Sequence, residues 1–337
     1  MILVTGGTGL VGSHLLFELT KNDQNIRALY RSTDTINKVR KVFSYYTDMI
    51  ETQFKKIEWI KADLNDLPKL EEAFRGITKV FHCAALISFA PNDYNQLKKI
   101  NTEGTANIVN LCISYSIQKL CYVSSVATLG FDPHKICEET PWRSEEIKNV
   151  YALTKYAAEK EVWRGIQEGV PSVIVNPGVI LGPGYFNSGS GLLFKIINKG
   201  LKYKTNGITG YVDVKDLVKS MLLLINEKHL NERYIIVGKT LSFSELTSKI
   251  SKVLGVKAPS KFIKKWMLSL AWRLDWIKHK VLGKKRKLTK NICKTLNSKN
   301  YYSSEKFLKL EKGFDFKPIS QTISEVGNLF LKEEKVS

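Results

Sequence analysis

The first half of the chain alternates short apolar runs with amphipathic segments. The apolar runs have the length of strands, and the segments between them repeat apolar residues at helical spacing. Such alternation is typical of repeated strand–helix–strand units, in which the strands pair in parallel and helices cover the sheet. The expected strands are Ile2–Thr5, Ile26–Tyr30, Ile57–Ala62, Val80–Ala84, Leu120–Ser124 and Ser172–Val175, and the expected helices are Leu10–Lys21, Ile36–Ile50, Tyr94–Ser116 and Val150–Glu168. We therefore predict an α/β fold with a doubly wound parallel sheet of six or seven strands.

The alternation stops after Gly182, where a glycine-rich segment over residues 182–191 begins. We expect residues 1–180 to form the sheet domain, with residues 211–237 returning to it. The rest of residues 181–337 is expected to form a smaller, substrate-binding region over the carboxyl edge of the sheet, where open α/β sheets bind ligands.

Composition narrows the class of protein. Apolar residues make up 43% and charged residues 25% of the 337 residues, which is typical of a globular chain with a sizeable core. The five cysteines are odd in number and include no C-x-x-C pair, which argues against a disulfide framework and a zinc site. No metal site is expected. No apolar run is long enough to cross a bilayer, and no basic segment of a signal peptide precedes the first strand, so we expect a cytoplasmic protein.

Glycines recur between the first expected strand and the first expected helix. Gly6, Gly9 and Gly12 fit the spacing G-x-x-G-x-x-G, and Gly7, Gly9 and Gly12 fit G-x-G-x-x-G. Glycine at these positions permits a tight turn, lets backbone N–H groups approach a pyrophosphate, and lets the helix pack on the strand. The context predicts a Rossmann-type dinucleotide-binding unit, and a glycine turn without a ligand is the alternative. The residues expected to bind the dinucleotide here are Gly6, Thr8, Gly9, Leu10, Val11 and Gly12.

The residues that end the second expected strand indicate the type of dinucleotide. An acidic residue there would bond the ribose 2′-hydroxyl and repel a 2′-phosphate. This chain instead has Arg31, which can form charge-assisted bonds to a phosphate, and Lys38 adds a second positive charge. NADP(H) is therefore favoured, and NAD(H) is the alternative.

The pattern Tyr-x-x-x-Lys occurs six times, so that it selects no site by itself. Position selects Tyr151 and Lys155, which open the helix after the strand Leu120–Ser124. The two side chains lie one turn apart, and the ammonium is expected to lower the phenol pKa so that the tyrosine acts as an acid or base. Ser125, at the carboxyl end of that strand, would polarise a substrate oxygen. The overlapping Tyr156 is expected to point elsewhere.

Taken in their order along the chain, the motifs resemble those of the extended short-chain dehydrogenase/reductase family, also called the NAD-dependent epimerase/dehydratase family. The resemblance covers roughly residues 1 to 240 and includes the glycine turn and the Tyr-x-x-x-Lys pair. Its other elements are Ala62-Asp63-Leu64, Phe81-His82-Cys83-Ala84-Ala85, Asn101-Thr102-Glu103-Gly104-Thr105, Tyr122-Val123-Ser124-Ser125 and Asn176-Pro177-Gly178.

The resemblance implies roles for individual residues. Asn101 would support the helix next to the active site. Ser125, which stands five residues before Gly130, would be the catalytic serine. The further residues that the resemblance places along the cofactor are Asp63 and Leu64 beside the adenine, Ala84 and Ala85 in the cleft, Ser124, and Pro177 and Val179 near the nicotinamide.

Departures from the family's patterns argue against some of its branches. Sugar-nucleotide dehydratases carry an Asp-Glu pair after the catalytic hydroxyl, where this chain has Val126 and Ala127. Sugar-nucleotide epimerases carry an arginine and an asparagine where this chain has Asn176 and Val179. What remains resembles the dihydroflavonol-reductase and 3β-hydroxysteroid-dehydrogenase branches.

The resemblance implies an oxidoreductase that moves hydride between NADP(H) and a ketone, aldehyde or secondary alcohol of an apolar small molecule. Tyr151 would act as acid or base. The alternatives are an NAD-dependent sugar-nucleotide epimerase and a non-catalytic dinucleotide sensor. The intact Ser125, Tyr151 and Lys155 count against a sensor. A homodimer is compatible with the family.

The last hundred residues match no motif, but their charge is uneven. The net charge of the chain is +20, and residues 251–290 contain 13 Lys or Arg and one acid. Residues 261–282 repeat apolar residues at helical spacing and include Trp266, Trp272 and Trp276. We expect a helix that covers the substrate-binding region with its apolar face inward, with contact to an anionic membrane as the alternative. The basic residues are expected to form a solvated face without a nucleic-acid partner.

Overall fold

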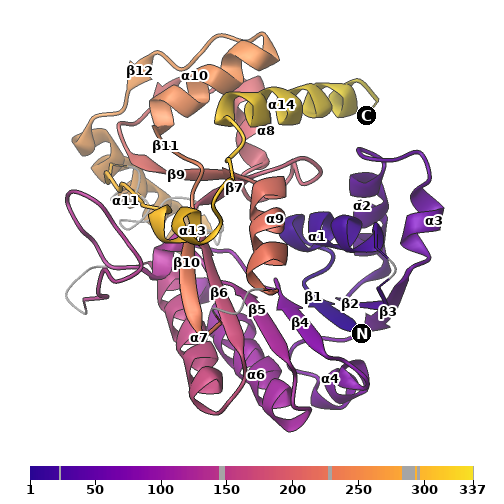
Figure 1. The fold of residues 1–337 in the computed structure, drawn as a ribbon. Helices are drawn as coiled ribbons and strands as arrows, with labels where there is room; N and C mark the ends of the chain where they lie inside the picture. The colour runs from indigo at the N-terminus through magenta and orange to yellow at the C-terminus, as the bar shows by residue number, and fades with distance from the viewer. Residues whose placement is uncertain (23, 144–148, 227–229, 283–292, 294–296, 337) are drawn as a thin grey trace.

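Seven parallel strands form one sheet at the centre of the chain (Figure 1). The computed structural model describes residues 1–22, 24–143, 149–226, 230–282, 293 and 297–336. The strands are β1 (Ile2–Thr5), β2 (Ile26–Tyr30), β3 (Ile57–Lys61), β4 (Lys79–His82), β5 (Lys119–Val123), β6 (Ser172–Pro177) and β10 (Glu232–Ile236). Their order is β10-β6-β5-β4-β1-β2-β3, and each neighbouring pair is parallel.

Helices cover both faces of this sheet, as Figure 1 shows. Side chains alternate along each strand, so that Ile2 and Val4 pack into one apolar core and Leu3 packs into the other. The helices are α1 (Leu10–Thr20), α2 (Thr33–Phe43), α3 (Ile50–Phe54) and α9 (Val214–Leu224) on one face, and α4 (Leu67–Phe74), α6 (Gly104–Ser114) and α7 (Val150–Gln167) on the other. The expected doubly wound α/β fold of the Rossmann type is confirmed.

Smaller elements lie beyond the carboxyl ends of the strands. The first of them, β7, begins two residues after the end of β6. β7, β9 and β11 form a three-stranded sheet, and β8 pairs with β12. The rings of Phe186, Phe194 and Phe330 contact one another in a third core. The elements are β7 (Val179–Leu181), α8 (Leu192–Asn198), β8 (Tyr203–Lys204), β9 (Ile208–Asp213), β11 (Lys239–Ser242), α10 (Phe243–Leu254), β12 (Lys261–Phe262), α11 (Lys265–Leu282), α13 (Glu305–Leu310) and α14 (Ile319–Val336).

The single helix expected over Ile36–Ile50 is wrong, because the structure has α2 and α3 with a turn between them. In the turn, the ring of Tyr46 stacks on Phe17 of α1 with 4.7 Å between the ring centroids. The Tyr46 hydroxyl is also hydrogen-bonded to Nδ1 of His14, 2.7 Å away. These contacts with α1 hold the turn, and a pattern of apolar spacing within one segment does not reveal them.

The long helix expected over Tyr94–Ser116 is interrupted. After α5 (Tyr94–Leu97), the segment Lys98–Glu103 is π-helical and leads into α6. The Thr105 hydroxyl donates to the carbonyl oxygen of Asn101 at 2.5 Å, within the junction of the two helical forms. Single π-helical turns often occur at functional sites, because the wider turn redirects one side chain.

Two helices that the apolar pattern did not predict have clear terminal signals. The Asp66 side chain accepts a hydrogen bond from the backbone N–H of Lys69 at the start of α4 (3.3 Å). The Ser242 hydroxyl does the same for Glu245 at the start of α10 (3.1 Å), and Gly255 ends that helix with a φ of 68°. Among the residues that the structure describes, no helix has both the length and the apolar character needed to span a bilayer.

Candidate active site

The glycine turn between β1 and α1 is shaped by close backbone contacts. A Cβ atom at Gly6, whose φ is +66°, would lie 2.6 Å from the backbone of Ala84, and one at Gly12 would lie 2.2 Å from the carbonyl oxygen of Gly6. Gly9 is the N-cap of α1 and has no side chain to satisfy the first N–H groups of the helix. The turn therefore leaves space and backbone donors for a pyrophosphate, so that it fits a dinucleotide.

The two cations expected near a 2′-phosphate lie beyond β2. Arg31 follows β2 directly, and Ser32 is the N-cap of α2. Lys38 lies in the middle of α2, and both cationic side chains are exposed. They are thus accessible to a phosphate from solvent.

The other residues expected along the cofactor follow the carboxyl ends of parallel strands, which meet at one edge of the sheet. They are Asp63 and Leu64 after β3, Ala84 and Ala85 after β4, Ser124 after β5, Pro177 at the end of β6, and Val179 at the start of β7. The Tyr185 hydroxyl donates to the carbonyl oxygen of Thr8 at 2.7 Å. The loop after β7 therefore closes on the glycine turn.

Ser125 and Tyr151 meet at the carboxyl end of β5. The Ser125 Oγ accepts a hydrogen bond from the backbone N–H of Ala127 (3.2 Å), which fixes the serine at the start of a short 3₁₀ turn. Tyr151 is the second residue of α7, a helix that the Asn149 side chain caps by accepting from the N–H of Ala152 (2.8 Å). The Ser125 hydroxyl lies near enough to the Tyr151 phenol to lower the pKa of the phenol, although burial outweighs this effect. The structure thus brings together the expected acid and its partner hydroxyl.

Lys155 lies one turn after Tyr151 and is 1% exposed. Its Nζ donates to the Tyr122 hydroxyl (2.6 Å) and to the carbonyl oxygen of Val123 (2.9 Å). Burial lowers the pKa of Lys155 to about 7, although the nearby Glu159 carboxylate raises it. Burial also raises the pKa of Tyr151 to about 12. The expected lowering of the tyrosine pKa is therefore wrong for this geometry, in which burial dominates and the ammonium is bonded to β5.

Asn101 lies on the π-helical segment and is buried. Its Oδ1 accepts from the N–H of Leu86 (2.8 Å), and its Nδ2 donates to the Leu86 carbonyl (3.0 Å) and to Thr154 Oγ1 (3.2 Å). This one side chain joins the loop after β4 to the helix that carries Tyr151 and Lys155. These bonds place Asn101 beside α7, where the supporting role that the family resemblance implies would require it.

Glu159 is a buried residue of this site that sequence reasoning missed. One of its oxygens accepts hydrogen bonds from Ser124 Oγ (2.5 Å), Thr128 Oγ1 (2.8 Å) and Asn176 Nδ2 (2.9 Å). The other oxygen pairs with Arg233, 3.1 Å away. The Ser124 hydroxyl is thus engaged with Glu159, whereas Ser125 faces Tyr151. The spacing Tyr-x-x-x-Lys-x-x-x-Glu on one helix face was the available signal.

Apolar side chains border the candidate proton donor. The ring of Phe89 meets the ring of Tyr151 edge to face, with 5.7 Å between the centroids. Phe89 is 41% exposed, and Ile87 of the same loop is 59% exposed. The tyrosine therefore lies beside an accessible apolar surface.

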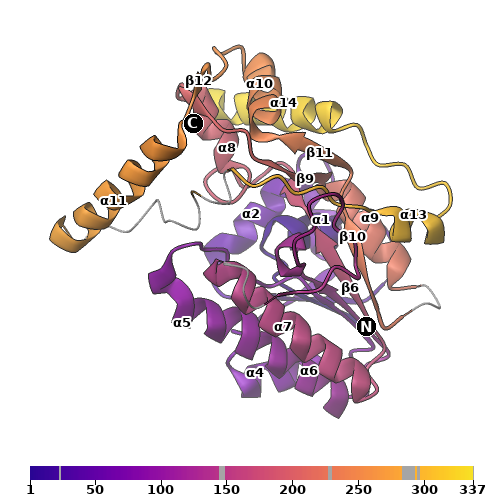
Figure 2. The same cartoon turned by 90° about the vertical axis from the view of Figure 1, so that its left-hand side faces the viewer.

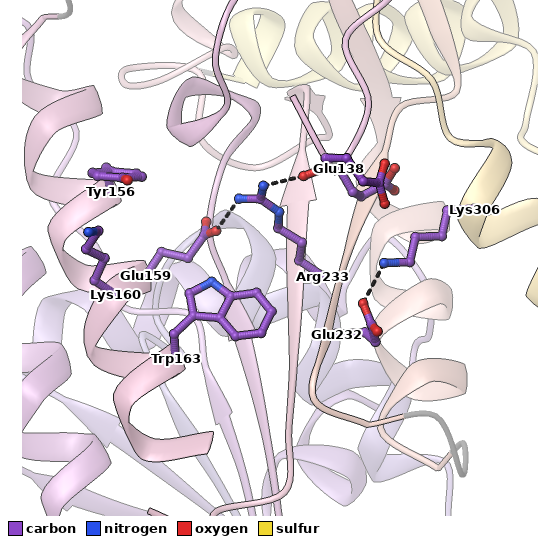
Figure 3. Close-up of a pocket in the computed structure, with 9 residues that line it drawn as sticks. Glu138, Tyr156, Glu159, Lys160, Trp163, Glu232, Arg233 and Lys306 are labelled. Carbon is purple, nitrogen blue, oxygen red and sulfur yellow. Dashed lines mark hydrogen bonds and ion pairs between the residues drawn. The ribbon is translucent and has the colours of Figure 1, made fainter. Parts of the chain in front are cut away.

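A separate pocket of about 310 Å³ opens on another side of α7 (Figure 3). Tyr156, Lys160 and Trp163 line it from α7, and the Tyr156 ring stacks on Trp142 with 4.1 Å between the centroids. Figure 3 shows Arg233 reaching from β10 toward Glu159 across this pocket. Tyr156 thus points away from Ser125, as expected.

Two buried histidines predict a loss of stability in acid. Burial lowers the pKa of His82 to about 3 and that of His14 to about 4, compared with 6.5 for a histidine exposed to water. Below pH 6.5 the unfolded chain therefore takes up protons that the folded chain does not, so that the stability of the fold decreases as the pH is lowered. We expect the free energy of unfolding to fall by about 1.5 kcal/mol per histidine between pH 6.5 and 5.

Urea unfolding of His82→Gln at the two pH values checks this prediction. The variant should lose about half of the combined pH effect of the two histidines, whatever its stability at neutral pH. His134→Gln, at an exposed histidine, is the control and should keep the full effect. An unchanged pH dependence in His82→Gln would contradict the prediction.

Comparison with known proteins places these motifs in one family. Residues 2–238 match the model of the NAD dependent epimerase/dehydratase family. The chain belongs to this family. The matched range contains the glycine turn, Asn101, Ser125, Tyr151 and Lys155, and members of the family bind NAD(P).

Relatives from this family include reductases. The chain is 27% identical to a Synechocystis sp. protein provisionally named dihydroflavonol 4-reductase, over 97% of this chain and 93% of that protein. It is 26% identical to cinnamoyl-CoA reductase 1 of Petunia hybrida, over 75% of this chain and 77% of that protein. The crystal structure of gox2253 superposes with a TM-score of 0.81 at 25% identity, covering 99% of this chain and 98% of that one.

The family match and these reductases identify the chain as an NAD(P)-dependent oxidoreductase of the extended short-chain dehydrogenase/reductase type, which acts on carbonyl or alcohol groups. The resemblance to the dihydroflavonol-reductase branch is confirmed.

Proposed function

We propose that the chain reduces the ketone or aldehyde of an apolar small molecule with NADPH. The placement of Ser125 beside Tyr151, at the carboxyl end of β5, is the observation that carries this proposal. Ser125 holds the carbonyl oxygen, and Tyr151 delivers the proton to it. Lys155 binds the ribose, and Asn101 holds α7 in place. A nicotinamide cofactor supplies the hydride in such a reaction.

The pKa of Tyr151 supports the reductive direction. Burial raises this pKa to about 12, so that the phenol carries its proton at neutral pH. A protonated phenol is ready to donate to a carbonyl oxygen, whereas oxidation of an alcohol requires a phenolate as the base. At neutral pH the phenol is therefore in the protonation state that the reductive direction uses.

The surroundings of Tyr151 support an apolar substrate. The rings of Phe89 and Tyr151 meet edge to face, and the side chain of Ile87, in the same loop as Phe89, is also exposed. An aromatic or aliphatic substrate that covers these side chains gains from the removal of apolar surface from water. We propose that residues 181–337 supply most of the remaining contacts with the substrate.

The proposal of NADPH rests on Arg31 and Lys38. Both side chains are exposed after β2, where a 2′-phosphate would meet them. We expect tighter binding of NADPH than of NADH, and Arg31→Ala should weaken NADPH binding by about tenfold because a charge-assisted bond is lost. The affinity for NADH should stay within about twofold of the wild type.

A fluorescence titration of both cofactors with purified protein measures these affinities. Arg40→Ala is the matched control, because Arg40 lies on the same helix and pairs with Glu51 instead. A wild-type preference for NADH, or an equal loss of both affinities in Arg31→Ala, would contradict the NADP proposal.

Two other functions remain as outcomes of experiment. A tightly retained NAD, together with turnover of sugar nucleotides, would favour an NAD-dependent epimerase. Binding of a dinucleotide without turnover of any ketone, aldehyde or sugar nucleotide would favour a sensor. The sugar-nucleotide branches are disfavoured because Val126 and Ala127 replace the Asp-Glu pair of the dehydratases and Asn176 replaces the arginine of the epimerases. The presence of both Ser125 and Tyr151 argues against a sensor. A homodimer stays a prediction.

A further inference from the structure

Helix α11 exposes apolar side chains along one face. Trp266, Leu270 and Leu274 are 63%, 50% and 49% exposed. They are spaced by four residues, so that they lie on the same side of the helix. Leu268 points elsewhere and is buried, and its carbonyl accepts a hydrogen bond from Cys293 Sγ at 3.7 Å. The expectation that the apolar face turns inward is therefore wrong for these three residues.

The position of α11 makes this face accessible. Figure 2 shows the helix extending away from the rest of the chain, on the side where α5 also lies. The exposed apolar surface continues into β12, where Phe262 is 51% exposed, and Trp276 farther along the helix is 44% exposed. We name the surface formed by Phe262, Trp266, Leu270 and Leu274 the α11 face.

Positive charge accompanies the α11 face. Lys261 and Lys264 are exposed beside Phe262, and Lys204 Nζ lies 4.5 Å from the centre of the Phe262 ring. The guanidinium of Arg273 lies 4.8 Å from the centre of the Trp272 ring. The apolar surface and the cations are therefore interleaved.

The sequence on both sides of α11 is also rich in positive charge. Residues 251–290 contain 13 Lys or Arg and one acid, Asp275, so that this stretch carries a net charge of +12. Residues 283–292 lie outside the described part of the chain.

We propose that the α11 face binds the surface of an anionic lipid bilayer. The helix would lie in the interface, with the apolar side chains of the α11 face among the acyl chains and Lys261, Lys264 and Arg273 at the headgroups. A second copy of this chain fits less well, because it would bring the same positive charge against the face. A nucleic acid would meet the cations but offers no apolar layer for the leucines. The proposal does not depend on which reaction the active site performs.

Sedimentation with lipid vesicles tests this proposal on the full chain. Vesicles of phosphatidylcholine and phosphatidylglycerol in equal amounts are compared with vesicles of phosphatidylcholine alone. We expect binding to the anionic vesicles, weakened by high salt because headgroup charges are screened. The triple variant Trp266→Ser, Leu270→Ser, Leu274→Ser should partition at least about tenfold less.

A matched control separates the α11 face from exposed apolar residues in general. Met49→Ser, Leu67→Ser, Leu308→Ser changes three side chains that are 64%, 47% and 38% exposed on other elements, and it should bind vesicles like the wild type. Because all six side chains are exposed, both triple variants should retain the circular dichroism and NADPH affinity of the wild type.

Three results would overturn the proposal. The wild type could stay in the supernatant with anionic vesicles at low salt. Both triple variants could bind the vesicles as the wild type does, which would show that charge alone drives binding. Sedimentation velocity could show a dimer that the α11 variant alone fails to form and that does not bind vesicles, which would assign the face to a second copy.

Discussion

Tyr151→Phe should lower kcat for carbonyl reduction by about 10²–10⁴-fold while leaving the affinity for NADPH within about twofold. The substitution removes only the phenolic hydroxyl, whose pKa the nearby Ser125 side chain influences. The ring and its edge-to-face contact with Phe89 stay in place. A lower kcat with an unchanged affinity for NADPH would therefore show that the proton donor is missing and that the rest of the site is intact.

Tyr156→Phe is the matched control for this experiment. Tyr156 lies on the same helix but stacks on Trp142 beside the separate pocket of Figure 3. The activity of this control should stay near that of the wild type. The oxidation of NADPH with a panel of apolar ketones and aldehydes supplies the assay. Full turnover by Tyr151→Phe with any compound that the wild type reduces would refute the proposed mechanism.

The second large effect concerns the glycine turn. Gly12→Ala should destabilise the fold by about 1–3 kcal/mol and reduce dinucleotide affinity at least about 100-fold. The reason is that a Cβ atom at Gly12 would lie 2.2 Å from the carbonyl oxygen of Gly6. The backbone must move to relieve this clash, and the same backbone is expected to contact the pyrophosphate.

Gly9→Ala separates folding from binding at this turn. A Cβ atom there would lie 3.4 Å from the Gly6 carbonyl oxygen, which is ordinary contact. We therefore expect stability close to that of the wild type but a dinucleotide affinity reduced at least about tenfold, since the new methyl group occupies space next to the phosphates. Urea unfolding and fluorescence titration measure the two properties. Unchanged affinity in both variants would argue against this turn as the pyrophosphate site.

In this site, burial sets the pKa values of the groups that are expected to act on the substrate. Burial raises the pKa of Tyr151 and lowers that of Lys155 to about 7. Glu159, on the next turn of the same helix, opposes the second shift and also holds the strand end that carries Ser124. A carboxylate behind the lysine therefore favours the charged ammonium at neutral pH.

The sequence alone determined the elements that depend on local spacing. Six of the seven strands of the parallel sheet, the glycine turn at Gly6–Gly12 and the pair Tyr151 and Lys155 follow from apolar periodicity and from short motifs, whereas β10 was not predicted as a strand. Each of these features is specified by residues close together in the chain, and they recur in an order that only a parallel α/β sheet accommodates. The family and the class of reaction were therefore predictable.

The tertiary structure decided what depends on contacts between distant segments. The break between α2 and α3 is held by contacts of Tyr46 with α1, and the edge-to-face contact of Phe89 with Tyr151 joins the loop after β4 to helix α7. The direction of the Tyr151 pKa shift follows from burial, which no spacing of residues reveals. The outward face of α11 is a further case, because a periodic apolar pattern marks a face but not which side of the molecule it meets. Such features arise when the whole chain packs, since burial and contact partners are properties of the fold and not of any single segment.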